Sequence, residues 1–525
     1  MRSGNVGRVR VLAVVAVLLS GAVACVAAAP RPEPLGASGE TTEADASRRT
    51  AAGPLNVLLI TVDDMGWDSL GITGSPIPNI TPNIDRLAAA GVLFTQAHVT
   101  IAICQPTRAV WMTGRYPHRN GALGFGPIDP DVPTLVEALG EAGYQTGLMA
   151  KTGHVVPSRL TAFDAVIGAK ELQNGRSPDL YYEHAAEFFR QAKNAEQPFF
   201  LMANSQDPHR PFAASRQEVN FRARDATSTS EQYGGGFPDA RLAFSPEQIP
   251  VPGYLIDLPD VRLEVAQYYT SVRRADATVG AVLRALDDSG MADRTLVMFL
   301  SDHGPSFPFA KANAWMHSTR TPWIVRWPGV IAAARTDAEH MISGVDLAPT
   351  ILDAVGLENL AGADGRSFVP VLRGETQAGR EVVFTQINSL SSGRPFPMRA
   401  VVGRRYGYIF NAWADGETSY RSEASGGLTF PAMREAGARD QAAAARVAHY
   451  LFRSPEELYD YRRDPDALES LIGQPEHSAT AARLRAMLLE HMRSTGDPQL
   501  AAFETWLAEL EQGPSGVRDE STGER

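Results

Sequence analysis

The sequence is poor in cysteine and has no excess of basic residues. Of its 525 residues only two are cysteines, Cys25 and Cys104. Lys and Arg together number 49 against 60 Asp and Glu, which gives a formal net charge of −11. A nucleic-acid binder needs a basic surface, so this balance argues against that class. It leaves open a small basic pocket for an anionic substrate.

The sequence also lacks an N-terminal apolar run long enough to anchor the mature chain as a membrane-spanning helix. The run at 11–19 follows three arginines and is shorter than the ~20 residues that a spanning helix needs. Small residues follow it, which is typical of an export signal. We therefore expect a signal peptide at 1–24, a flexible linker at 25–54, and export to the periplasm or the extracellular space. Cys25 is either the first mature residue or the attachment site of a lipid.

Cys104 is then the only cysteine of the mature chain that carries no such terminal role. Exported proteins usually pair their cysteines, so a lone one is either a buried apolar thiol or a reactive or modified residue. Composition alone favours the buried thiol. The residues that follow Cys104 reverse this preference.

Buried strands and amphipathic helices alternate along most of the chain. Continuous apolar runs occur at 56–61, 145–150, 198–203 and 295–301, and helical patterns at 82–90, 132–142 and 261–288. Runs of this kind suit strands that are buried on both faces of a parallel sheet. We predict an α/β fold with a mostly parallel sheet sandwiched by helices. For the first helix, Thr81 is the expected N-cap and Gly91 the expected stop.

Two other segments break this alternation. Residues 211–259 contain three consecutive glycines and several prolines, and we predict a long insertion there. Beyond residue 374 short strands are expected at 381–387, 399–403 and 406–411, followed by a helix at 479–495. We therefore predict a main domain at 55–374, a smaller α+β subdomain with an antiparallel sheet at 375–512, and a disordered tail at 513–525.

Polar residues follow each of the four apolar runs. They are Asp63 and Asp64, then Lys151 and His154, then His209, and finally Asp302 and His303. In open α/β sheets ligands bind beyond the carboxyl ends of the strands. Four separate segments therefore deliver candidate site residues to one edge of the sheet, and we expect their side chains to meet.

A fifth segment reads Cys104-Gln105-Pro106-Thr107-Arg108 and continues to Thr113-Gly114-Arg115. Proline is tolerated in the first turn of a helix, so Cys104 is expected at a helix N-terminus. Free backbone N–H groups and the helix dipole favour an anion at that end. Arg108 lies four residues on and projects from the same face as Cys104.

The Cys-x-Pro-x-Arg element with its downstream Thr-Gly-Arg resembles the signature of the type I sulfatases, which belong to the alkaline-phosphatase superfamily. The resemblance covers about 55–497. Four stretches are similar to the heparan N-sulfatase (sulfamidase) branch: 207–210, 307–313, 397–399 and 457–460. The chain departs from the pattern at His303, where asparagine is frequent, and at Lys311, where sulfamidases carry arginine.

The resemblance implies a formylglycine-dependent hydrolysis of a sulfate ester or a sulfamate, with a sulfated small molecule or glycan as substrate. In that family a formylglycine-generating enzyme oxidises the motif cysteine, and a hydroxyl of the aldehyde hydrate attacks sulfur. The implied ligands of one Ca²⁺ or Mg²⁺ ion are Asp63, Asp64, Cys104, Asp302 and His303. The implied catalytic residues are Cys104, Arg108, Lys151, His154, His209 and Lys311. We expect Arg399 to bind the sugar.

Within these roles, Arg108 and Lys151 stabilise the hydrate and the sulfuryl oxygens. His209 and Lys311 hold sulfate and protonate the leaving group, and His154 removes a proton from the second hydroxyl. Two rival functions remain. One is a phosphomonoesterase or phosphodiesterase of the same superfamily, and the other is a binding protein without catalytic activity.

Overall fold

The computed structural model describes residues 54–156, 158–225, 236–238 and 240–512. All of them belong to one unit of the chain, Pro54–Arg525. The predicted signal peptide, linker and tail lie outside the described residues, as does part of the predicted insertion. Among the described residues no helix is both long and apolar enough to cross a membrane.

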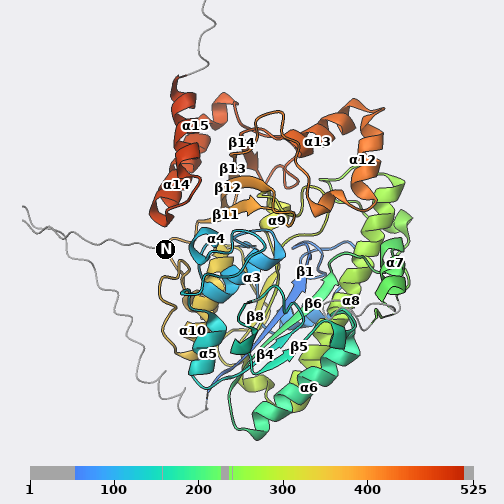
Figure 1. The fold of residues 1–525 in the computed structure, drawn as a ribbon, viewed down its shortest axis with the longest axis vertical. Coiled ribbons are helices and arrows are strands. Elements are labelled where there is room, and N and C mark those ends of the chain that lie inside the picture. Colours follow the sequence, from blue (N-terminus) through green and yellow to red (C-terminus); the bar gives the residue numbers. More distant parts are fainter. Residues whose placement is uncertain (1–53, 157, 226–235, 239, 513–525) are drawn as a thin grey trace, which may run out of the picture. The chain divides into compact units, whose positions relative to one another are not determined.

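An eight-stranded sheet forms the centre of this unit, in the order β5-β4-β6-β1-β7-β8-β2-β9 (Figure 1). The first five strands in this order run parallel to one another, and β8 is antiparallel to both β7 and β2. The bounds are β1 Asn56–Asp63, β2 Val92–Phe94, β4 Gln145–Met149, β5 Ala165–Ile167, β6 Phe199–Pro208, β7 Thr295–Ser301, β8 Trp323–Arg326 and β9 Arg335–Asp337. The predicted fold class, a mostly parallel sheet between helices, is confirmed.

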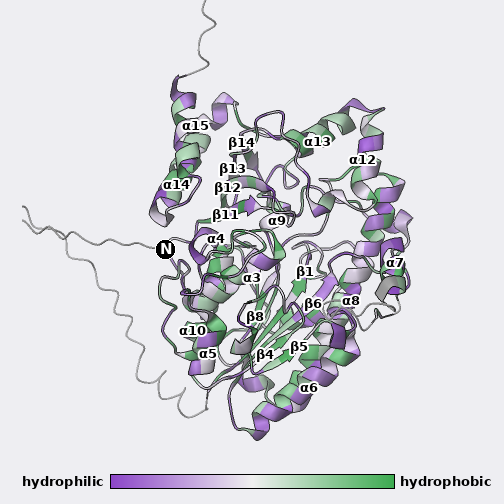
Figure 2. Ribbon diagram, viewed as in Figure 1, coloured by the Kyte–Doolittle hydropathy of each residue, from purple (hydrophilic) through white to green (hydrophobic). Residues whose placement is uncertain are grey.

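The central strands form because nearly all of their residues can be buried. Every residue of β1 and β7 is buried, and Figure 2 shows hydrophobic colouring along the strands. All four predicted apolar runs are strands, although β6 and β1 extend further than the runs into polar residues. Trp323 lies in β8 and is fully buried.

Helices cover the sheet on both sides (Figure 1). On one side α6 (Pro178–Asn194) and α8 (Pro259–Ser289) pack together, and α8 also contacts β6 and α2 (Pro82–Ala89). On the other side α3 (Cys104–Thr113), α5 (Leu135–Glu141) and α10 (Leu347–Val355) pack against one another. The remaining short elements are β3 Ala97–His98, α4 Pro117–Asn120, α9 Met316–Thr319, β10 Ile342–Ser343 and α11 Val369–Leu372.

The predicted start of α2 is confirmed, because Thr81 occupies its N-cap position. The Thr81 side chain makes no cap hydrogen bond: its hydroxyl donates to Asp85 Oδ1 at 3.0 Å and accepts from the backbone N–H of Gly71 at 2.9 Å. The helix ends at Ala89 with Ala90 as its C-cap, one residue before Gly91. Glycine is needed at 91 for another reason: a Cβ atom there would collide with the backbone carbonyl of Val325 in β8.

The insertion contains a helix that the sequence pattern did not predict, α7 (Arg216–Asp225). The helix is polar and carries no apolar periodicity, and its contacts include an aromatic pair between Phe221 and Phe237, with ring centroids 5.9 Å apart, and ionic contacts. Glu218 is buried and pairs with Arg274 of α8, with 2.9 Å between Oε1 and Nη1. This pair fixes α7 beside the main body.

The C-terminal part contains a second, antiparallel sheet in the order β11-β12-β13-β14. Its strands are β11 Val382–Ser389, β12 Pro395–Gly403, β13 Tyr406–Asn411 and β14 Glu456–Asp460, and its helices are α12 Thr429–Gly437, α13 Gln441–Phe452, α14 Ser478–Thr495 and α15 Leu500–Gln512. Three strands and α14 were predicted. The pattern missed β14, α12, α13 and α15. In β14 two glutamates are buried, which hid the strand from a hydrophobicity pattern.

Candidate active site

The first two candidate residues lie where β1 ends. Asp63 is the last residue of β1, and Asp64 adopts a left-handed backbone conformation with φ of 68°. The backbone N–H of Asp64 donates to Asp302 Oδ1 at 3.1 Å, and that of Met65 donates to Ser301 Oγ at 2.9 Å. These bonds tie the end of β1 to the end of the adjacent strand β7. The two acidic segments are therefore neighbours, as predicted.

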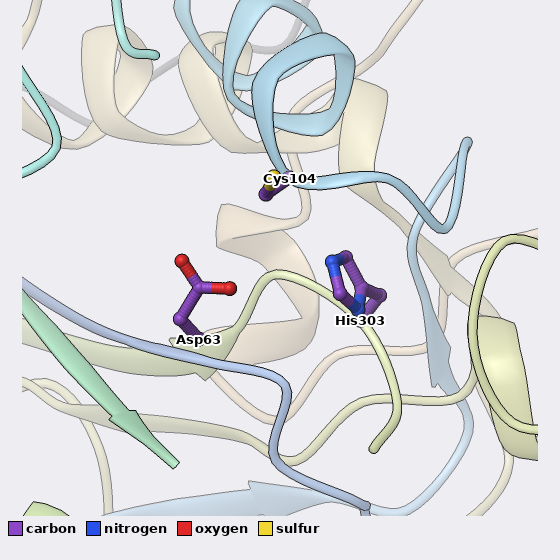
Figure 3. Close-up of side chains that lie close together, drawn as sticks. All are labelled: Asp63, Cys104 and His303. Atoms are coloured by element: carbon purple, nitrogen blue, oxygen red, sulfur yellow. The ribbon is translucent and has the colours of Figure 1, made fainter. Parts of the chain in front are cut away.

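Asp63, Asp64, Asp302 and His303 each offer one ligand atom, and these four atoms lie within 4.8 Å of one another. All four residues are buried. Cys104, the first residue of α3, forms a second such group with Asp63 and His303, and the three side chains point toward one another in Figure 3. The five predicted metal ligands are thus brought together.

The hydrogen bonds of His303 support a cation in this space. Its Nδ1 lies 3.0 Å from the carbonyl oxygen of Gly304, so Nδ1 carries the proton and Nε2 is left as an acceptor. Nε2 has no hydrogen-bond partner and faces Asp64 Oδ1 at 3.4 Å and Asp302 Oδ1 at 3.7 Å. Burial lowers the pKa of His303, which keeps the ring neutral. Buried hydrogen-bond acceptors that face one another, such as this nitrogen and the two carboxylate oxygens, are stabilised by a cation between them.

Arg108 binds the acidic group from the side of α3. It is fully buried, and its Nη2 lies 2.9 Å from Asp302 Oδ2 and 3.5 Å from Asp63 Oδ2. Its Nη1 donates to Asn204 Oδ1 at 2.7 Å and to Thr61 Oγ1 at 3.0 Å. One planar guanidinium therefore spans two strand ends, and Asn204 fixes its orientation.

Each adjacent aspartate also has its own lysine. Lys151 pairs with Asp63 Oδ2, and Lys311 Nζ donates to both oxygens of Asp64, at 2.8 and 2.9 Å. Burial alone would raise the pKa of Asp63, but Lys151 and the other cations hold it well below its usual value. Burial disfavours the charge of Lys311, yet Asp64 and Glu423 raise its pKa well above the ordinary value.

The turn after β4 presents Lys151 and His154. Ala150 and Lys151 both have positive φ angles, 55° and 53°, an uncommon backbone conformation for residues with a Cβ atom. The backbone N–H of His154 donates to the carbonyl of Lys151 at 2.8 Å, which closes the turn. Burial and then the charge of Lys151 hold the pKa of His154 well below its usual range, so this imidazole is neutral and can accept a proton.

His209 directly follows the last residue of β6 and lines the pocket. Its Nδ1 lies 2.5 Å from the carbonyl oxygen of Arg210, which leaves Nε2 as the free ring nitrogen. Arg176 Nη2 donates to the carbonyl of His209 at 2.9 Å, and Arg176 Nε donates to the buried carboxylate of Asp207 at 3.1 Å. Burial and then the charge of Lys311 lower the pKa of His209 to about 3. His209 is therefore neutral in the free pocket.

These residues open into one pocket of about 450 Å³. Its lining includes Cys104, Lys151, His154 and His209, the arginines 176 and 210, and the aromatic residues 125, 221 and 237. Cys104 lies at the charged part of this pocket, near Asp63, Lys151 and Lys311. Burial raises the pKa of the Cys104 thiol, and the nearby Asp63 raises it further. An unmodified thiol here would be protonated at neutral pH and a poor nucleophile.

The net charge of this end also fits a divalent cation. Arg108, Lys151 and Lys311 carry three positive charges, while Asp63, Asp64, Asp302 and Glu423 carry four negative ones when ionised. The three histidines are neutral. A bound divalent ion would leave one net positive charge, which a single sulfate group would neutralise. Three carboxylates beside one imidazole suit a hard cation such as Ca²⁺ or Mg²⁺ better than a structural zinc ion.

The prediction for Arg399 needs correction, because the structure does not bring this residue to the pocket. Arg399 is 2% exposed, and all five of its N–H donors bind inside the protein. They donate to both oxygens of Asp497, at 2.5 and 2.9 Å, to Asn388 Oδ1, and to the carbonyls of Ile387 and Met398. No donor is left for a sugar, so Arg399 has a structural place between β12 and the turn after α14.

Sequence reasoning missed three charged residues that line the pocket: Arg176, Arg210 and the acidic Glu423. The Glu423 carboxylate forms an ion pair with Lys311 and lies in a group with Asp64 and His209 whose ligand atoms are within 4.8 Å. Glu423 stands in an irregular segment more than one hundred residues after Lys311, and no local pattern identifies it. Asn204, which no local pattern identifies either, supports Arg108 through the contact described above.

Comparison with known proteins agrees with this geometry. Residues 55–357 match the family model described as Sulfatase. The chain is 30% identical to human N-sulphoglucosamine sulphohydrolase over 480 residues, which cover 87% of this chain and 94% of the human protein. The match spans both the main sheet and most of the C-terminal part.

Solved structures share the fold. The structure of BT4656 in complex with its substrate D-glucosamine-2-N,6-O-disulfate aligns with a TM-score of 0.63 at 19% identity and covers 85% of this chain and 99% of that one. A phosphonate monoester hydrolase from Silicibacter pomeroyi aligns with a TM-score of 0.59 at 20% identity, covering 85% and 96%. Fold alone therefore does not separate sulfate from phosphonate chemistry.

The fold and the family match together place this hydrolase in the alkaline-phosphatase superfamily. The chain belongs to the sulfatase family and is a sulfuric ester hydrolase, as the Cys104 motif predicts.

Proposed function

We propose that this sulfatase removes a sulfate ester or sulfamate group from a sugar at the end of a glycan chain, and that N-sulfoglucosamine is the first substrate to test. The observation that carries the reaction is the position of Cys104. Cys104 is the first residue of α3 and lines the pocket. Its side chain lies beside a buried group of carboxylates and the His303 imidazole, whose Nε2 has no hydrogen-bond partner.

Cys104 is proposed to act after oxidation to formylglycine by a formylglycine-generating enzyme. The hydrate of that aldehyde supplies a hydroxyl nucleophile at the position of the Cys104 sulfur. The low acidity of the buried thiol supports this, because unmodified cysteine would be a weak nucleophile at this place. The N-terminus of α3 offers free N–H groups toward the same point.

The proposed metal ligands are Asp63, Asp64, Cys104, Asp302 and His303, with Ca²⁺ as the first choice and Mg²⁺ as the alternative. When bound, the cation would polarise a sulfate oxygen and stabilise charge on the nucleophile. The chain's own contribution is to hold this site in place. Arg108 and the Asp64 backbone N–H fix Asp302, and the carbonyl of Gly304 fixes the tautomer of His303.

The remaining charged residues are proposed to act on the sulfate group and its leaving oxygen or nitrogen. Arg108 and Lys151 stabilise the sulfuryl oxygens. Lys311, whose pKa is raised, holds the sulfate as a permanent cation. His209 is neutral in the free pocket, and the negative charge of a bound sulfate would raise its pKa, so that it can deliver a proton to the leaving group. His154, neutral and lacking a partner at Nδ1, removes a proton from the hydrate.

Two observations support a terminal sugar as substrate. The sulfamidase-like stretches around His209 and Lys311 come from distant parts of the chain, yet His209 lines the pocket and Lys311 pairs with Glu423 of the same lining. The human relative at 30% identity is named as a sulfohydrolase of N-sulphoglucosamine. We also propose that the chain is exported, on the basis of the predicted signal at residues 1–24.

A panel of sulfated sugars tests this proposal. Free sulfate is measured after incubation of the calcium-loaded protein with N-sulfoglucosamine, sulfated disaccharides and an intact sulfated glycan, with Cys104→Ala as the inactive control. Sulfate release from the mono- or disaccharides supports the proposal. Release from internal positions of the polymer alone contradicts the terminal-sugar proposal, and no release from any sulfated compound contradicts the function itself.

A further inference from the structure

Glu423 is the one carboxylate among the described residues that line the pocket. It begins a short 3-10 turn, Glu423–Ser425, which the C-terminal part contributes to the pocket wall together with Gly426 and Gly427. Its carboxylate pairs with Lys311, and its ligand atom lies within 4.8 Å of those of His209 and Asp64. The negatively charged side chain of Glu423 therefore lies at the edge of the proposed sulfate-binding site.

Charge neutralisation of Lys311 does not account for this glutamate. Lys311 Nζ already donates to both oxygens of the fully buried Asp64, at 2.8 and 2.9 Å. The Glu423 side chain is still 36% exposed and lines the pocket. A carboxylate in this position repels a nearby anion and accepts hydrogen bonds from O–H and N–H groups.

The cations elsewhere on the pocket wall are already matched by carboxylates. Arg176 is paired with Asp207 Oδ1 at 3.1 Å, and Arg210 is paired with Glu264 Oε1 at 2.5 Å. Both of these carboxylates are buried behind the wall. Among the described residues, the wall therefore holds no arginine without a carboxylate partner that would balance a second anionic group placed against Glu423.

We propose that Glu423 is a specificity-determining residue of the sulfatase site. It accepts a hydrogen bond from a hydroxyl or amine substituent beside the sulfated position, and it excludes substrates that carry a second sulfate or a carboxylate there. The substrate class is thus a sugar with one sulfate group and a hydrogen-bond donor next to it. This inference rests on the function proposed above.

The test compares wild-type protein with Glu423→Gln, which keeps the shape and the acceptor oxygen but removes the charge. The probes are N-sulfoglucosamine and the same sugar with a second sulfate at the neighbouring 3-position, together with N-acetylgalactosamine 4-sulfate with and without a neighbouring 3-sulfate. The ratio of kcat/KM for the monosulfated sugar to that for the disulfated sugar is measured for each pair. Glu435→Gln is the matched control, because Glu435 lies nearby in α12 but pairs at the surface with Arg439.

We expect the wild-type protein and Glu435→Gln to share one ratio, and Glu423→Gln to lower it by roughly tenfold or more. One charge repulsion near a protein surface has this scale, reduced by solvent because the side chain is partly exposed. An unchanged ratio in Glu423→Gln, with sulfate still released from the monosulfated sugar, overturns the inference and leaves the proposed function intact. Absence of sulfate release from every probe by the wild-type protein overturns both.

A binding measurement covers the case in which Glu423→Gln turns over too slowly to assay. The dissociation constants of the same sugars are measured by calorimetry on Cys104→Ala and on Cys104→Ala combined with Glu423→Gln. The inference predicts that the second variant binds the disulfated sugar more tightly relative to the monosulfated one, by the same factor. Equal relative affinities in the two backgrounds contradict selection by Glu423 and indicate that it only supports Lys311.

Discussion

Two substitutions of Arg108 separate the effect of its positive charge from the effect of its hydrogen-bond geometry. Arg108 is fully buried, contacts Asp302 and Asp63 through Nη2, and donates to Asn204 and Thr61 through Nη1. Arg108→Met removes the charge and both sets of contacts. Arg108→Lys keeps a charge, but a single ammonium group cannot reach the carboxylates and the Asn204–Thr61 pair together.

The magnitudes follow from these contacts. Breaking a buried ion pair by removing one partner costs about 3–5 kcal/mol, so the free energy of unfolding of metal-free Arg108→Met should fall by that amount. Arg108→Lys should lose roughly 2–3 kcal/mol, because two buried acceptors lose their donor. Both variants should lose about 10²–10³-fold in kcat, the usual effect of removing a positioned donor from the transition state.

Urea unfolding monitored by tryptophan fluorescence, after chelation of metal, gives the stabilities, and sulfate release gives the rates. Arg439→Met, at an exposed surface pair, is the control and should change neither quantity measurably. The reasoning fails if Arg108→Met is as stable as the wild-type protein, or if Arg108→Lys retains full activity. The first result would mean that the carboxylates are not charged in the folded protein.

Three further predictions test other parts of the account. Asp302→Ala should lose calcium binding, measured by calorimetry, together with turnover; full turnover in a demonstrably metal-free protein would contradict the metal role. Arg399→Met should lower stability by about 3–5 kcal/mol, because Asp497 is left buried and unpaired, while KM stays unchanged; a raised KM without loss of stability would return Arg399 to the substrate site. Burial and then Arg320 lower the pKa of His98 to about 3, so the folded state resists its protonation and stability is lost as pH falls below about 6.5. At pH 5.0, 1.5 units lower, the contribution of His98 to this loss is about 2 kcal/mol at ~1.36 kcal/mol per unit. Other buried histidines with lowered pKa values destabilise both proteins over the same range. In urea unfolding, His98→Gln should therefore lose about 2 kcal/mol less than the wild-type protein between pH 7.5 and 5.0, and equal losses in both proteins would refute the assignment.

The sequence was most informative where a local pattern and a buried element coincide. The run 295–301 is β7 to the residue, because every side chain in it is apolar or small enough to be buried on one of the two faces of the sheet. Cys104 was expected at a helix start from Pro106 alone, and α3 begins there. The acidic residues after β1 and β7 meet because adjacent parallel strands end at the same edge of the sheet.

The rest depended on contacts between distant segments, which no local pattern encodes. Arg399 was expected in the pocket from its motif, but its direction is decided by Asp497, 98 residues further along the chain. Glu423 reaches the pocket through an irregular turn whose position depends on how the C-terminal part packs. The helix α7 is polar and is fixed by the pair between Glu218 and Arg274, so periodicity could not predict it.

The central claim is that Cys104 works as formylglycine in a sulfatase reaction, and one measurement tests it most directly. The protein is produced together with a formylglycine-generating enzyme, and the peptide that contains Cys104 is analysed by mass spectrometry beside an assay of sulfate release. The account predicts an aldehyde at residue 104, trapped by a hydrazide reagent, and a rate of sulfate release that rises in proportion to the aldehyde fraction across preparations. Full sulfatase activity in a preparation whose residue 104 is entirely unmodified thiol would contradict it.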